Sequence, residues 1–127
     1  MREILFRGWW PLTGEWLYGN LTHYSDNYKC IRDSHMGGPG WQVDENSVGQ
    51  YVGQTDKKNK KIFEGDIVVL GNHGSRPLVV KFIDFSWQCV SEIGDTQYRH
   101  RIEGDSSMYE VIGNIYENKE ILEAYNG

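Results

Sequence analysis

Two carboxylates that flank a glycine, in the corner Glu64-Gly65-Asp66, are the residues of this chain with the clearest capacity for chemistry. Two carboxylates at this spacing can bind a metal ion or act as an acid–base pair. Glu64 and Asp66 share one face of an extended strand, yet no third acidic ligand follows at a usable spacing. A glycine also permits a sharp bend, and an aspartate accepts backbone N–H groups at a turn. The sequence therefore favours a structural corner and predicts no metal and no cofactor.

Histidines and a cysteine form a second set of metal-ligating candidates. His23, Cys30 and His35 lie in one polar segment, and a fourth ligand would have to come from His73 or His100. These separations match neither a zinc finger nor a zinc knuckle, so we predict no metal site here. Two cysteines are also too few for a disulfide scaffold, and we expect both thiols to be reduced.

The sequence offers no nucleophile in a catalytic setting. No serine lies in a Gly-x-Ser-x-Gly elbow, and neither cysteine has a neighbour that would lower its pKa. Cys89, between Trp87 and Val90, is expected to be a buried apolar residue. A phosphate-binding loop and a dinucleotide fingerprint are both missing. We therefore predict that the protein is not an enzyme.

Basic residues gather in one turn and in one predicted strand, where an aromatic residue accompanies them. The candidates for nucleic-acid binding are Lys57, Lys58, Lys60, Lys61, Tyr98, Arg99 and Arg101. Such residues can contact a phosphate backbone and stack on bases. A lysine-rich turn also keeps an exposed sheet edge soluble, and the net charge of -5 opposes nucleic-acid binding. Nucleic-acid binding is thus the alternative function and not the favoured one.

Aromatic residues are concentrated near the start of the chain, in a segment that predicts a hairpin. The candidates for self-association are Trp9, Trp10, Trp16 and Tyr18. Adjacent residues of a strand point to opposite faces, so at most half of them can face a local core. An exposed tryptophan or tyrosine would mark an interface, whereas the alternative is a small satellite core. We expect a homo-oligomer.

The elements that must position these residues are mainly strands. Five Trp, eight Tyr and fifteen Gly in 127 residues suit short, twisted strands joined by tight turns. Alternation and turn residues predict strands at 3–10, 15–21, 47–51, 67–70, 78–90, 96–102 and 108–116, with a short helix at 119–124. A change of parity within 78–90 predicts either a bulge near Ile83 or a hairpin turning at 84–86. Between the early strands, 23–40 is expected to be a long loop with one short strand near 28–31.

Three segments together resemble the YopX family of phage and prophage proteins. They are residues 1–9, with the start Met-Arg-Glu-Ile-Leu-Phe-Arg-Gly-Trp; residues 48–68, which end in the Glu-Gly-Asp corner and a buried strand; and residues 109–122. The resemblance implies an N-terminal β-hairpin lobe with a long loop, 1–46, followed by a small SH3-like β-barrel with a short C-terminal helix, 47–127. It implies a phage-derived gene expressed inside a bacterium. It brings no established activity and no catalytic residues.

We therefore expect a mainly β, non-enzymatic accessory protein that acts by protein binding and self-association in the cytoplasm of a bacterial host. Its partner would be a host or phage protein. The longest aliphatic run, 67–70, is far shorter than a membrane span, so no membrane partner is expected.

Overall fold

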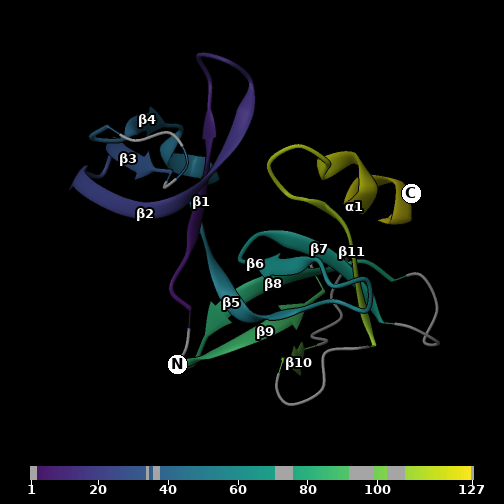
Figure 1. The fold of residues 1–127 in the computed structure, drawn as a ribbon. Helices are drawn as coiled ribbons and strands as arrows, with labels where there is room; N and C mark the ends of the chain where they lie inside the picture. Colours follow the sequence, from purple (N-terminus) through teal and green to yellow (C-terminus); the bar gives the residue numbers. More distant parts are fainter. Residues whose placement is uncertain are drawn as a thin grey trace. The chain divides into compact units, whose positions relative to one another are not determined.

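The computed structural model of the protein describes residues 3–33, 35, 38–70, 76–91, 99–102 and 108–126. The chain divides into two compact units, residues 1–53 and 54–127. This division falls inside the predicted second domain. Both units consist mainly of antiparallel strands (Figure 1), which confirms the prediction of a mainly β protein.

The first unit is built on a strongly bent antiparallel sheet with the strand order β4-β3-β2-β1-β5. Its elements are β1 (Phe6–Trp10), β2 (Glu15–Ser25), β3 (Tyr28–Arg32), β4 (Trp41–Val43), the 3-10 helix η1 (Glu45–Ser47) and β5 (Gly49–Thr55). β5 runs past the boundary between the units, and β6 follows it in the sheet order. In Figure 1, β2 is the long curved ribbon that carries the chain from β1 to β3.

Strands occupy much of the segment that was predicted to be a long loop. β2 continues to Ser25 and pairs with β3, with an irregularity in register between His23 and Ser25. The short strand expected near 28–31 is confirmed as β3. The prediction of a loop from residue 23 was wrong because residues 22–25 of β2 are all exposed, so this end of the strand shows no alternation of apolar and polar residues in the sequence.

The core of the first unit lies on one face of this sheet. Leu17, Ile31 and Val43 are buried there, and partly buried Phe6, Trp10, Leu21 and Val48 pack around them. The register explains the grouping, because Gly8 pairs with Leu17 and Leu21 with Ile31, and directly paired residues point to the same face.

The second unit contains a five-stranded antiparallel sheet with the order β10-β9-β8-β7-β11. Its elements are β6 (Lys61–Phe63), β7 (Asp66–Leu70), β8 (Leu78–Ile83), β9 (Ser86–Val90), β10 (Arg99–Arg101), β11 (Tyr109–Asn114) and the helix α1 (Lys119–Asn126). The predicted C-terminal helix is thereby confirmed. Within the ranges that the structure describes, the strands do not close into a barrel, so the SH3-like barrel stays a prediction.

The core of the second unit is mostly aliphatic but includes an aromatic ring, and its most deeply buried members are Ile62, Ile67, Val68, Leu78, Val79, Val80, Cys89 and Tyr109. Of the two alternatives for 78–90, the hairpin is confirmed. β8 and β9 pair from Val79–Val90 to Ile83–Ser86, and Asp84 and Phe85 form the turn with φ of 52° and 63°. Two positive φ angles in succession match the twist of antiparallel strands.

Candidate functional site

The Glu64-Gly65-Asp66 corner has a structural role in the second unit. Buried Asp66 accepts the Phe63 N–H at 2.7 Å through Oδ2, which confirms the predicted role of its carboxylate. Gly65 has φ of 90°, donates its N–H to Val80 O and accepts the Ile115 N–H, both at 2.9 Å. Only glycine adopts that φ readily.

Among the described residues, no three His, Cys, Asp or Glu side chains lie together in a way that could hold a metal ion.

Both cysteines are free thiols inside the protein. Burial raises the pKa of Cys30. Burial also raises the pKa of Cys89 to about 11, and its Sγ lies 3.4 Å from His100 O. Burial therefore disfavours the thiolate, the reactive form, in both residues.

We expect native Cys89 to react with iodoacetamide at pH 8 about 100-fold more slowly, or slower still, than the same thiol in the unfolded chain, because its side chain is fully buried and burial raises its pKa to about 11. Peptide mass mapping after timed labelling measures the rate. The same thiol in urea serves as the control. Labelling of native Cys89 at the rate of the unfolded chain would contradict its burial.

The lysine-rich turn is anchored by one aspartate, Asp56, whose role the sequence did not reveal. Asp56 is 4% exposed. Its Oδ1 accepts the N–H groups of Lys58 at 2.8 Å and Lys60 at 2.9 Å, and its Oδ2 accepts the Val111 N–H at 2.9 Å. Asn59 has φ of 64°, as predicted. A single carboxylate therefore shapes the turn and fastens it to β11.

Two of the four lysines in the turn share a carboxylate on β11. Glu110 lies 3.2 Å from Lys57 Nζ and 2.9 Å from Lys58 Nζ. The hydrogen bond from Lys58 lowers the pKa of Glu110, and the same bond raises the pKa of Lys58. This contact reduces the positive field that a phosphate backbone would meet. No local pattern could reveal it, since Glu110 is distant in sequence.

The second basic cluster lies on β10, the edge strand opposite β11 in the five-stranded sheet. Arg99 and Arg101 are exposed on β10, and Arg99 Nη1 lies 3.4 Å from Asp84 Oδ2. His100 points to the other face, where its Nδ1 is 2.7 Å from the Tyr109 hydroxyl. Tyr98 lies outside the described residues. Nucleic-acid binding through these residues stays a prediction.

In the first unit, the register of β1 and β2 separates the aromatic residues that were predicted to act together. Trp9 pairs with Trp16, and Tyr18 pairs with Arg7, so these side chains share one face of the sheet. Trp10 is on the opposite face, with the core. The predicted self-association set is thus divided between two faces.

The face that carries Trp9, Trp16 and Tyr18 is an ordered aromatic layer, which we name the outer face. The rings of Trp9 and Trp16 meet edge to face, with centroids 5.3 Å apart. The Arg7 guanidinium lies 4.8 Å from the Trp16 ring centroid, within range of a cation–π interaction. Tyr18 is exposed beside them. These contacts hold the two tryptophans against the sheet and leave Tyr18 accessible.

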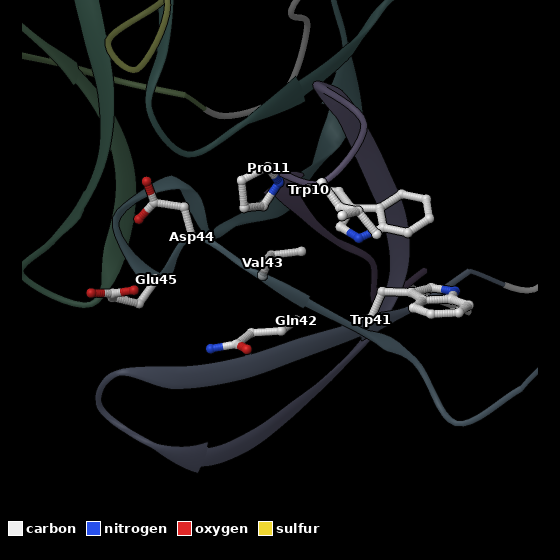
Figure 2. Close-up of a pocket in the computed structure, with 8 residues that line it drawn as sticks. Trp10, Pro11, Trp41, Gln42, Val43, Asp44 and Glu45 are labelled. Atoms are coloured by element: carbon white, nitrogen blue, oxygen red, sulfur yellow. The ribbon is translucent and has the colours of Figure 1, made fainter.

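Trp10 lines a groove of about 810 Å³, which we name the aromatic groove. Its lining residues are Trp10, Pro11, Leu12, Trp41, Gln42, Val43, Asp44 and Glu45. The rings of Trp10 and Trp41 are stacked, with centroids 5.1 Å apart and planes at 29°. Leu12 and Trp41 are 78% and 40% exposed, so the groove opens to solvent. Figure 2 shows the indole rings at one end and the two carboxylates at the other.

Backbone hydrogen bonds hold the acidic end of the aromatic groove against β1. The Asp44 N–H donates to Trp9 O at 2.9 Å, and the Trp9 N–H donates to Ser47 Oγ at 2.7 Å. Asp44 Oδ1 accepts the Asn46 N–H at 3.0 Å and so caps η1. The acidic end of the groove is therefore bonded to β1, the strand that also carries Trp10. Sequence reasoning missed Trp41 because it lies next to the segment predicted to be a loop.

These features define the protein as a mainly β protein of two compact units, with an open aromatic groove in the first. The model of the family described as YopX protein matches residues 5–123, so the chain belongs to the YopX family. The crystal structure of protein EF1440 from Enterococcus faecalis is similar in fold, with a TM-score of 0.58 and 23% identity over 96% of this chain and 99% of that chain. No curated protein matched. No described helix is long and apolar enough to span a membrane.

Proposed function

We propose that this protein is a non-enzymatic accessory protein that binds another protein, and that the aromatic groove takes up an extended segment of that partner. The observation that carries the proposal is the stacked pair Trp10–Trp41, which lines an open groove of about 810 Å³. Grooves of several hundred cubic ångströms accommodate ligands. Tryptophan is typical of the residues that supply binding energy at interfaces, and Trp41 is the exposed member of the pair.

The groove is suited to binding because it is already formed. The stacked rings, the cap on η1 and the Asp44–Trp9 hydrogen bond fix its two ends. A rigid site loses little conformational entropy when a partner binds. Extended peptides commonly occupy grooves lined by aromatic side chains.

The proposal includes an SH3-like arrangement of the second unit. His100 and Tyr109 belong to β10 and β11, the two edge strands of its sheet, and their side chains approach to 2.7 Å. This contact supports a sheet that curls upon itself. Membership of the YopX family supports our expectation of a phage- or prophage-derived gene whose product acts in the bacterial cytoplasm.

Selection from a library of short random peptides tests the proposed function. We expect the wild-type protein to enrich a family of peptides and Trp41→Ala to lose that enrichment, because the substitution removes one of the two stacked indole rings of the groove. Phe85→Ala is a matched control, since Phe85 is an exposed aromatic residue of the other unit. Enrichment of the same peptides by Trp41→Ala would contradict the proposal.

Self-association through the outer face is a separate prediction. We expect light scattering at increasing protein concentration to show a mass above that of the monomer, and Tyr18→Ser to reduce it, because Tyr18 is the exposed member of the aromatic layer. Tyr24→Ser, at another exposed tyrosine of β2, is the control. A monomer at every concentration would rule out self-association and leave binding in the groove open to its own test.

A further inference from the structure

We infer that the segment bound in the aromatic groove is proline-containing and carries an arginine or lysine, whose cation lies at the Asp44–Glu45 end. This inference rests on the proposed function and specifies the chemistry of the partner. It combines the apolar platform, the distribution of charge around the groove and the hydrogen-bonding capacity of the tryptophans.

Charge complementarity is the first argument. Two carboxylates, Asp44 and Glu45, line the groove, and none of its lining residues is basic. Beyond the lining residues, the same face of the sheet carries Glu15 opposite Trp10 and Lys29 opposite Val43, so these two charges offset each other and the carboxylates of the groove itself decide its charge. Within the described part of the chain, Glu45 forms no ion pair or hydrogen bond, although its side chain is partly buried. A cation from the partner would supply the missing counter-charge.

The platform is the second argument. The indoles of Trp10 and Trp41 lie at the end of the groove opposite the carboxylates (Figure 2). Flat apolar rings match the proline rings of a polyproline II helix, and the hydrocarbon stem of arginine can lie along such a surface. An extended segment advances about 3.1 Å per residue in this conformation, so a few residues connect the platform to the acidic end.

Backbone recognition is the third argument. The indole N–H groups of Trp10 and Trp41 form no hydrogen bond among the described residues. Each indole N–H is a donor only. A polyproline II segment has no internal hydrogen bonds, so its carbonyl groups are available to accept these N–H groups. A proline-containing segment can therefore pack its rings against the indoles and accept hydrogen bonds from the indole N–H groups.

Fluorescence anisotropy with labelled synthetic peptides tests the inference. One peptide combines prolines and alanines with an arginine beside them, and a second replaces the arginine with neutral citrulline. Both are made in the two chain directions, because a polyproline II segment can bind either way. We expect the arginine peptide to bind the wild-type protein about threefold to tenfold more tightly than the citrulline peptide, and added salt to reduce this difference.

Glu45→Gln is the decisive variant, because it removes charge while conserving size, and Asp44 still caps η1. We expect Glu45→Gln to abolish most of the preference for arginine and Trp41→Ala to weaken both peptides. Equal binding of arginine and citrulline peptides that depends on Trp41 would overturn the inference and leave the proposed function intact. The absence of binding by every peptide would also overturn the inference. Binding of a neutral oligosaccharide instead, lost in Trp41→Ala, would overturn both.

Discussion

Replacement of Asp56 with alanine is expected to lower the free energy of unfolding of the second unit by about 3 kcal/mol or more. The substitution leaves three backbone N–H groups without their acceptor, those of Lys58, Lys60 and Val111. An unsatisfied buried donor costs about 1–3 kcal/mol, whereas donors near the turn can recover part of this loss by binding water. Urea unfolding followed by tryptophan fluorescence measures the change.

Glu110→Gln is the control for this prediction. It weakens the ion pairs with Lys57 and Lys58 at the same contact between the turn and β11, but leaves the buried hydrogen bonds of Asp56 in place. We expect a much smaller loss of stability, because exposed ion pairs contribute little. Equal losses in the two variants would show that the anchor is electrostatic at the surface and does not depend on the buried carboxylate.

The pH dependence of stability supplies an independent check on Asp56. Burial opposes its ionisation, but hydrogen bonds from Val111, Lys60 and Lys58 outweigh that effect, and the pKa is lowered. Because the folded pKa lies below the unfolded value of about 3.9, the stabilisation is present above that pH and is lost as the pH falls through the folded pKa. Asp56→Asn should therefore flatten the loss of stability in acid. An unchanged acid profile would contradict this assignment.

Gly19→Ala is expected to destabilise the first unit by about 3 kcal/mol or more. A Cβ at this position would lie 2.0 Å from the Arg32 carbonyl oxygen and 2.8 Å from its carbon. Backbone atoms cannot turn aside as a flexible side chain can. Relief of the clash requires β2 to move away from β3 beside the pair Asn20–Arg32. Overpacking that displaces backbone lies at the severe end of the usual range.

Thr22→Ala on the same strand is the matched control, and a change within about 0.5 kcal/mol is expected, because Thr22 is exposed. Thermal unfolding and limited proteolysis of both variants give the comparison. If Gly19→Ala fails to accumulate in soluble form while Thr22→Ala is normal, the prediction is also met. A Gly19→Ala protein as stable as the wild type would show that β2 and β3 separate there at no cost.

The parts of this fold that could be predicted from the sequence are those determined by residues adjacent in the chain. The bend at Gly65, the turn at Asn59 and the hairpin tip at Asp84 and Phe85 depend on local conformation. The aromatic hairpin was predictable because Trp9 and Trp16 flank a short turn. Local steric preference and turn chemistry are properties of a few adjacent residues, so a single sequence reveals them.

The remainder depends on contacts between distant segments. Trp41 reaches Trp10 only because β2, β3 and β4 bend together around Leu17, Ile31 and Val43. The partner of Asp56 is the backbone of Val111, a group that every residue but proline possesses. Neither contact has a compositional signature. The aromatic groove was therefore invisible in the sequence, and β4, which supplies part of its lining, was not predicted.

The anchor on Asp56 also sets an order of events during synthesis. Its carboxylate leaves the ribosome long before Val111 and Tyr109, the residues whose backbone completes the turn. Until those residues emerge, the Asp56 carboxylate lacks the Val111 N–H group that it accepts in the folded protein, so its burial is unfavourable. The second unit can therefore finish folding only after β11 has emerged, whereas residues 1–53 have their sheet partners available much earlier. Ribosome-bound intermediates of this protein would thus present a formed aromatic groove ahead of an unfinished second unit.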